Sequence, residues 1–264
     1  MTVNRLRELF ADGGSAVGGW CTTPSAVNAE LLGVEGYDYV CIDCQHGLIG
    51  YDAMVPQMVA LARTGTTPLV RVPFNHTPWP GQALDAGAEG VIVPMVNTRD
   101  DAERAVAACR YAPDGVRSFG PVRAGLFLNQ APPSEVNRQV LCFVMIETVQ
   151  AVENAEEICA TPGVDGVYVG PADLALSMGV AFGVDELPPA HAEAIDHVAK
   201  ACAARGIVAG IHTGGGADAR RALDSGYRMA TVSTDAAIFR QAISAELAAA
   251  RGEGDTGAGG GIYG

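Results

Sequence analysis

Two carboxylates at the ends of apolar runs are the residues of this sequence that best suit metal chemistry. Glu147 closes the run CFVMIE, and Asp173 follows 26 residues later in VGPADL. Carboxylates from adjacent strands can bind a hard octahedral cation, namely Mg²⁺, Mn²⁺ or Co²⁺, and leave positions for water and a chelating substrate. A structural role fits the same spacing, because a carboxylate in the first turn of a helix favours the helix dipole. The spacing alone leaves both interpretations open.

Three more ionisable residues lie at or just after the ends of earlier apolar runs. Asp43 ends the run YVCID, and His46 lies three residues beyond it, where the two could form an oriented general base. A loop histidine is, however, more often an ordinary hydrogen-bonding residue. Arg71 lies in LVRVP, and a guanidinium among valine and leucine side chains needs an anionic partner. A developing enolate or a substrate carboxylate could be this partner.

The single lysine of the chain is informative through its position. Lys200 lies in HVAKACAARG, in the middle of an expected helix and not at a strand end. Schiff-base aldol chemistry needs a desolvated lysine amine, so this mechanism and pyridoxal phosphate chemistry are both disfavoured. Metal-assisted enolisation remains as the way to stabilise a carbanion beside a carbonyl. The sequence therefore predicts a divalent metal and no organic cofactor.

These residues need a scaffold that brings strand ends together. Short β-branched runs alternate eight times with Ala-rich helical segments, which is typical of repeated βα units around a parallel sheet. Eight alternations, with no GxGxxG after the first strand, favour a closed (β/α)8 TIM barrel whose active site lies at the C-terminal ends of the strands. The predicted strands are 16–21, 39–43, 67–72, 90–94, 141–146, 166–169, 208–212 and 229–232. The predicted helices that follow them are 25–32, 51–63, 80–86, 99–109, 148–159, 172–178, 217–223 and 236–249.

The chain length suits one barrel domain over residues 1–251, followed by a flexible Gly-rich tail, 252–264. Two additions to a minimal barrel are expected: an extra helix at 190–203 and a long loop at 113–138. The net charge of −13 argues against a nucleic-acid or anionic-membrane partner and favours a small-molecule substrate. No apolar run reaches the ~20 residues that cross a bilayer, and the seven scattered cysteines suit a reducing compartment, so the protein is expected to be cytoplasmic.

Five segments, taken in order, resemble the HpcH/HpaI aldolase family, the class II pyruvate aldolases that include 4-hydroxy-2-oxoheptanedioate aldolase. The resemblance runs through most of the predicted barrel, and its last two segments are specific. It implies a lyase that joins or separates pyruvate, or a related 2-oxo acid, and an aldehyde. The segments are IDCQHG (42–47), PLVRVP (68–73), LDAGAEGVIVPMV (84–96), VMIET (144–148) and VGPADLALSMG (169–179).

The resemblance also implies roles for individual residues. Glu147 and Asp173 would bind the divalent metal, which pyruvate chelates through its carboxylate and keto oxygens. Arg71 would stabilise the enolate oxygen. The backbone amides of Ala172 and Asp173, at a helix N-terminus, would help to hold the pyruvate carboxylate.

Further implied roles extend to a second subunit. His46, held by Asp43, resembles the base that works through a water on the aldol hydroxyl. Asp85 matches a family acid that reaches the histidine of an adjacent subunit, which implies a homo-oligomer, commonly a hexamer. The chain departs from some members at Gln45 and Met145, where they carry Glu and a polar residue. These departures leave the metal ligands intact, but metal affinity or preference is expected to differ.

The partner aldehyde is expected to contact loops at the rim of the barrel. The long loop carries Arg117, Ser118 and Arg123, and the turn HTGGG begins at His212. A glycine-rich turn before a helix can bind phosphate or carboxylate through backbone amides, or can simply be a tight connection. We hypothesise that Arg123 and His212 contact the aldehyde half.

Two other functions fit parts of the same pattern. One is an acyl-CoA lyase of the citrate lyase β or malyl-CoA lyase type, although such chains are usually longer and end in a lid. The other is a non-catalytic oligomer that binds a 2-oxo acid, against which the retained Asp43, His46, Arg71, Glu147 and Asp173 argue. Oxaloacetate decarboxylation would need the same metal and enolate and is a plausible side activity.

Overall fold

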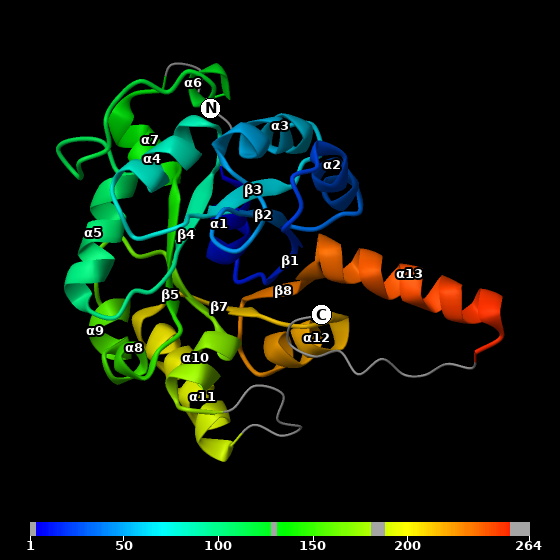
Figure 1. The fold of residues 1–264 in the computed structure, drawn as a ribbon. Coiled ribbons are helices and arrows are strands. Elements are labelled where there is room, and N and C mark those ends of the chain that lie inside the picture. The colour runs from blue at the N-terminus through cyan, green and yellow to red at the C-terminus, as the bar shows by residue number, and fades with distance from the viewer. Residues whose placement is uncertain (1–3, 128–130, 181–187, 254–264) are drawn as a thin grey trace.

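The chain forms a closed barrel of eight parallel strands in a computed structural model that describes residues 4–127, 131–180 and 188–253. Successive strands pair in chain order, and β8 pairs with β1 to close the barrel (Figure 1). This confirms the predicted (β/α)8 TIM barrel. The strands are β1 (Ala16–Cys21), β2 (Tyr39–Asp43), β3 (Thr67–Arg71), β4 (Gly90–Val93), β5 (Leu141–Ile146), β6 (Gly166–Val169), β7 (Val208–His212) and β8 (Met229–Thr234).

Large side chains that belong to one buried cluster fill the inside of the barrel. Trp20, Tyr39, Phe143 and Tyr168 are at most 1% exposed and pack together with smaller residues of the other strands. Gly18 makes room for the Tyr39 ring, because a Cβ at this position would lie 2.0 Å from a ring carbon. The opposite face of the strands carries valine and isoleucine side chains that pack against the helices, as expected for a parallel sheet covered on its outside.

Helices follow the strands close to the predicted places, with one correction. The predicted continuous helix over 148–159 is two helices that meet at Asn154, whose side chain donates a hydrogen bond to the Asn97 carbonyl. The helices are α2 (Ala26–Val34), α3 (Tyr51–Leu61), α4 (Pro78–Asp85), α5 (Arg99–Cys109), α8 (Val149–Glu153), α9 (Ala155–Cys159), α10 (Pro171–Ser177), α11 (Pro189–Arg205), α12 (Gly216–Asp224) and α13 (Asp235–Arg251).

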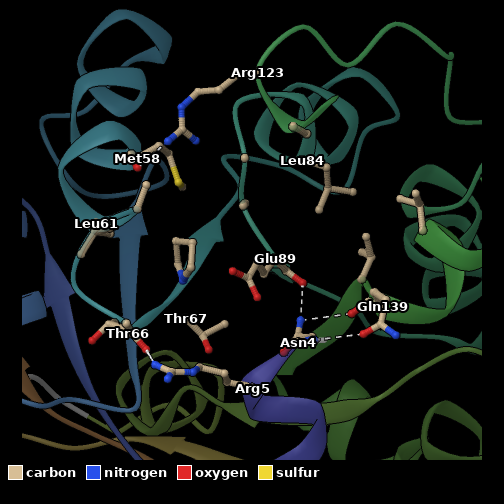
Figure 2. Close-up of a pocket in the computed structure, with 18 of the residues that line it drawn as sticks. Asn4, Arg5, Met58, Leu61, Thr66, Thr67, Leu84, Glu89, Arg123 and Gln139 are labelled. Carbon is tan, nitrogen blue, oxygen red and sulfur yellow. Dashed lines mark hydrogen bonds between the residues drawn. The ribbon is translucent and has the colours of Figure 1, made fainter. Parts of the chain in front are cut away.

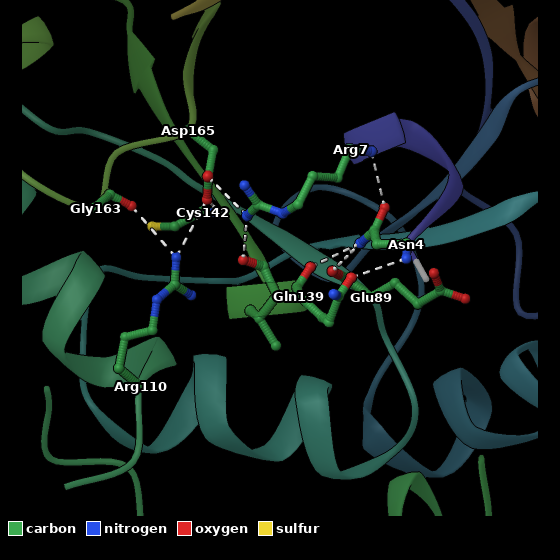
Figure 3. Close-up of polar contacts among 9 residues, drawn as sticks. Asn4, Arg7, Glu89, Arg110, Gln139, Cys142, Gly163 and Asp165 are labelled. Atoms are coloured by element: carbon green, nitrogen blue, oxygen red, sulfur yellow. Dashed lines mark hydrogen bonds and ion pairs between the residues drawn. The ribbon is translucent and has the colours of Figure 1, made fainter. Parts of the chain in front are cut away.

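A short helix, α1 (Arg5–Ala11), closes the N-terminal end of the barrel and was not predicted. Its Leu6 and Phe10 belong to the cluster inside the barrel. Around it, Arg7 and Arg110 both bond the carboxylate of Asp165, at 2.8 and 3.2 Å (Figure 3). This end of the barrel is therefore closed by apolar packing beside two ion pairs that share Asp165.

The extra helix predicted at 190–203 is α11, and the predicted long loop contains two helices, α6 (Ala124–Phe127) and α7 (Pro133–Gln139). The last helix, α13, extends away from the barrel (Figure 1). Gly252 ends this helix, and the rest of the predicted tail, from residue 254, lies outside the described residues. None of the helices in the described ranges is long and apolar enough to span a membrane.

Candidate active site

The C-terminal ends of neighbouring strands bring the predicted ionisable residues together. Asp43 ends β2 and Arg71 ends β3, and the two residues are paired in the sheet register. Glu147 follows β5 directly, and Asp173 is the third residue of α10, just after β6. The charges of Asp173 and Arg71 both act on Glu147. The rim of the barrel thus carries these four residues in one site.

Asp43 and Arg71 form a two-pronged ion pair. Nε of Arg71 donates to Oδ1 of Asp43 at 2.9 Å, and Nη2 donates to Oδ2 at 2.5 Å. Burial alone raises the pKa of Asp43, but the hydrogen bonds and charge of Arg71 outweigh it and hold the pKa below its usual value. Within the described residues Nη1 of Arg71 makes no hydrogen bond, so this corner of the guanidinium can donate to a substrate oxygen.

Aromatic rings surround this ion pair. Nε1 of Trp20 donates to Asp43 at 3.2 Å, and the Trp20 ring lies 5.1 Å from the guanidinium carbon of Arg71. The same ring stacks on Tyr168 and meets the edge of His212, with centroids 5.6 and 4.9 Å apart. Burial, followed by the charge of Arg71, lowers the pKa of His212 to about 4, against a smaller opposing effect of Asp43. His212 is therefore neutral at pH 7.

Glu147 is buried and held by a single backbone donor. The N–H of Met95 donates to Oε1 of Glu147 at 2.7 Å, and Met95 is the one non-glycine residue with positive φ, 55°, in the described part of the chain. Burial raises the pKa of Glu147 to about 7; the charge of Asp173 adds to this shift, whereas the Met95 hydrogen bond and Arg71 oppose it. Gly170 lies against the other oxygen, since a Cβ there would be 2.8 Å from Oε2.

His46 lies beside the ion pair in the loop after β2, and its side chain is exposed. Its backbone N–H donates to Oδ1 of Asp43 at 3.2 Å, and the N–H of Gln45 donates to the same oxygen at 3.0 Å. No hydrogen bond between the His46 imidazole and Asp43 occurs in the described structure. Asp43 thus holds the loop that carries His46 through the backbone, and the role of the imidazole as a base stays a prediction.

Comparison with known proteins assigns the family. The model of the HpcH/HpaI aldolase/citrate lyase family matches residues 17–242. The chain belongs to this family. A hydroxypyruvate/pyruvate aldolase from Rhizorhabdus wittichii is 38% identical over 249 residues, which cover 94% of this chain and 99% of the relative. A 5-keto-4-deoxy-D-glucarate aldolase from Escherichia coli is 34% identical over 241 residues, with 90% and 93% of the two chains covered.

A solved structure agrees with this assignment. The crystal structure of an HpcH/HpaI aldolase/citrate lyase family protein from Burkholderia cenocepacia matches with a TM-score of 0.88 at 35% identity, over 94% of this chain and 99% of that one. As a member of the HpcH/HpaI family, the protein is an enzyme of the lyase class and an aldolase. The resemblance of the sequence motifs is thereby confirmed.

The donor set at the rim of this HpcH/HpaI aldolase suits a divalent cation. Among the described residues no group of three or more His, Cys, Asp and Glu side chains has the arrangement of a metal site. Two neighbouring carboxylates, Glu147 and Asp173, fit a hard cation that completes its coordination with water and substrate oxygens. At the start of α10, Ala172 and Asp173 follow Pro171 in the first turn, whose N–H groups have no partner within a helix.

Two of the predicted site residues lie elsewhere in the chain. Asp85, at the end of α4, pairs with Arg117 at 2.6 Å. Arg123 donates to the carbonyls of Met58 and Ala86, at 2.8 and 2.6 Å, near the ends of α3 and α4. Both arginines line a cavity of about 590 Å³ at the N-terminal ends of the strands (Figure 2). Within one chain the structure therefore does not bring Asp85 or Arg123 to Glu147, and their predicted roles stay predictions.

Sequence reasoning missed Trp20 and Met95. Trp20 is one of several apolar residues in β1, and the part of Met95 that contacts Glu147 is its backbone N–H. The only available signal for Trp20 was its place on a strand whose neighbour ends in Asp43. Met95 carries no such signal, because β4 ends without a charged residue.

Proposed function

We propose that this protein is a divalent-metal-dependent aldolase that makes or cleaves a 4-hydroxy-2-oxo acid, with pyruvate or a related 2-oxo acid and an aldehyde as the smaller compounds. The observation that carries the proposal is the pairing of two carboxylates, Glu147 and Asp173, with the preorganised Arg71–Asp43 ion pair on one rim. Both relatives described above are named as aldolases, one of them for hydroxypyruvate and pyruvate, which supports the proposed class of substrate.

Glu147 and Asp173 would hold the cation, Mg²⁺, Mn²⁺ or Co²⁺, and no organic cofactor would be needed. When bound, the cation would supply a Lewis acid for the negative charge on the 2-oxo acid. The Met95 N–H binds Oε1 of Glu147, and the other oxygen, Oε2, lies on the side of Gly170. The first-turn amides of Ala172 and Asp173 would bind the substrate carboxylate.

Arg71 would act on the keto oxygen. Its Nη1 has no hydrogen-bond partner among the described residues, while Asp43 fixes the other edge of the guanidinium. A donor that is already oriented is worth most where charge develops, here as a methyl proton leaves or a carbon–carbon bond breaks. His46, exposed at the rim, would move the proton of the aldol hydroxyl through a water. The neutral ring of His212 would contact the aldehyde half.

The working form would be a cytoplasmic homo-oligomer, with a hexamer favoured. Asp85 cannot serve the site of its own chain, because it lies near the opposite end and pairs with Arg117. An adjacent subunit would bring its Asp85 to His46. The exposed apolar side chains of α13, including Phe239, Ile243 and Leu247, give a surface that another subunit would cover.

Incubation of the metal-stripped protein with pyruvate in D₂O tests the proposal. We expect the methyl proton signal to disappear when Mn²⁺ or Mg²⁺ is added, and Glu147→Ala to abolish this exchange. Glu103→Ala is the matched control, since Glu103 is 52% exposed on α5 and pairs only with Arg99 there.

Aldehydes would then be screened with pyruvate as the nucleophile. Absence of exchange with every metal would contradict the proposal. Cleavage of an acyl-CoA thioester by the same sample would then identify the acyl-CoA lyase instead, and binding of pyruvate without exchange would identify a non-catalytic oligomer.

A further inference from the structure

Trp20 contacts both members of the Asp43–Arg71 ion pair although it carries no charge. Its indole N–H donates to Oδ2 of Asp43, the same oxygen that accepts the Nη2 hydrogen bond of Arg71. Its ring face lies under the Arg71 guanidinium, 5.1 Å from the guanidinium carbon. Trp20 is 1% exposed, so neither contact competes with bulk water.

The ring of Trp20 is itself held from the other side of the barrel. Tyr168 of β6 stacks on it with an interplanar angle of 24°, and the edge of His212 of β7 meets it at 81°. The hydroxyl groups of Tyr168 and Thr231 in turn share a hydrogen bond of 2.5 Å. A buried side chain held by several ring contacts is restricted to one orientation, and its N–H can then fix the position of a neighbouring carboxylate.

This fixation matters because an arginine side chain has many rotamers. Asp43 binds the Nε and Nη2 edge of Arg71, and Nη1 makes no hydrogen bond within the described residues. A shift of Asp43 would move the whole guanidinium fork with it. A displacement of about 1 Å in a hydrogen-bond donor that stabilises developing charge is enough to slow a reaction strongly while leaving the fold intact.

We propose that Trp20 is a positioning residue, which holds the Asp43–Arg71 pair so that the free Nη1 of Arg71 points at the keto oxygen of the 2-oxo acid. The inference rests on the proposed function, since it assigns Arg71 the developing oxyanion. In this role Trp20 would act through the Asp43 carboxylate and the Arg71 guanidinium. Its effect would belong to the transition state and not to substrate binding, because the bound cation and backbone amides would hold the ground state.

The variant Trp20→Phe tests this, because it keeps a ring under the guanidinium and removes the N–H donor. We expect kcat for pyruvate proton exchange to fall about tenfold, with KM and directly measured Mn²⁺ affinity unchanged. In the double variant Trp20→Phe/Asp43→Asn, exchange should be no slower than in Asp43→Asn alone, since both changes break the same contact. Trp79→Phe is the matched control, because Trp79 is the other tryptophan and lies 37% exposed on α4.

A second measurement does not depend on catalysis. Protein labelled with 5-fluorotryptophan should give two fluorine signals, and Trp79→Phe identifies the one from Trp20. We expect Asp43→Asn to shift the Trp20 signal and leave that of Trp79 in place.

An unchanged kcat in Trp20→Phe, or effects of Trp20→Phe and Asp43→Asn that multiply, would overturn the inference. A Trp20 signal that does not respond to Asp43→Asn would overturn it as well. A wild-type protein without any proton exchange would contradict the proposed function instead, and the fluorine signals would still decide whether Trp20 holds Asp43.

Discussion

Two carboxylates, Asp165 at one end of the barrel and Glu147 at the other, differ in how the chain satisfies them. At the N-terminal end, both oxygens of Asp165 are satisfied: Arg7 binds one, and Arg110 and the Cys142 N–H bind the other (Figure 3). At the C-terminal rim, Glu147 has a single backbone donor, from Met95, and burial raises its pKa to about 7. One carboxylate is neutralised by the chain itself, and the other is left short of positive charge.

The difference indicates what each end is for. Charges that are paired within the chain stabilise a fold and leave no interaction for a ligand. A carboxylate that is buried with too few partners costs stability in the free protein, and that cost is offset when a cation binds. Asp165 therefore helps to close the N-terminal end of the barrel, whereas Glu147 at the rim keeps an interaction that a cation could satisfy. Three changes break or sharpen this contrast, beginning with the carboxylate whose pairing within the chain is complete.

Asp165→Ala should lower the free energy of unfolding by about 2–3 kcal/mol, because it leaves Arg110 buried without its carboxylate. The magnitude is below that of a fully enclosed pair, since Arg7 is 33% exposed and reaches water. Urea unfolding of the metal-free protein measures it, and kcat of the folded variant should not change.

Asp218→Ala removes the carboxylate of an exposed pair with Arg221 and is the matched control. It should change stability by less than about 0.5 kcal/mol. Equal losses in Asp165→Ala and Asp218→Ala would show that the N-terminal ion pairs do not stabilise the barrel.

The same contrast explains how much could be predicted from the sequence. The strands could be predicted, because β-branched runs between helical segments are local patterns. Five of them, β1, β2, β5, β6 and β7, have the predicted bounds. The site residues at strand ends followed from the fold, since parallel strands end on the same rim. Helix α1 and the break in the predicted helix over 148–159 could not be found, because tertiary contacts decide them.

The parts of the site that escaped prediction are those without a local signal. The contact from Met95 comes from a backbone N–H, and the one from Trp20 comes from an apolar side chain that points inward. Arg123 was assigned to the aldehyde from its loop, but the path of a long loop is set by its packing. Here that path takes Arg123 to the carbonyl ends of α3 and α4, where a guanidinium also suits the helix dipoles.

Glu147→Gln should remove a pH dependence of stability. The unfolded chain loses the Glu147 proton near the ordinary pKa of 4.5, but the folded protein keeps it until about pH 7. The folded state binds more protons in this window, so the free energy of unfolding falls as the pH rises, by about 3 kcal/mol in the metal-stripped protein. Between pH 5 and pH 8 the free energy of unfolding of the variant should therefore fall by about 3 kcal/mol less than that of the wild type, as urea unfolding at the two pH values would reveal.

Glu103→Gln is the control and should keep the full dependence, as its carboxylate is exposed. The pKa of Glu89, which lines the cavity at the other end, is also raised to about 7 by partial loss of solvent, although the residue is exposed. Its pH dependence is the same in the wild type and both variants. Added Mn²⁺ should restore stability at pH 8 in the wild type and not in Glu147→Gln. If the free energy of unfolding changed equally in the wild type and in Glu147→Gln between pH 5 and pH 8, Glu147 would not be short of positive charge in the folded protein.

The smallest effect concerns the backbone that holds Glu147. Met95 has φ of 55°, a conformation that costs a residue with a Cβ about 1 kcal/mol relative to glycine. Met95→Gly and Met95→Ala both remove the side chain and keep the N–H, but only glycine relieves the strain. The glycine variant should therefore be about 1 kcal/mol more stable than the alanine variant in urea, with the same Mn²⁺ affinity. Equal stabilities would mean that the rim stores no strain at Met95, whereas weaker Mn²⁺ binding by the glycine variant would show that the fixed backbone, and not only its N–H, orients Glu147.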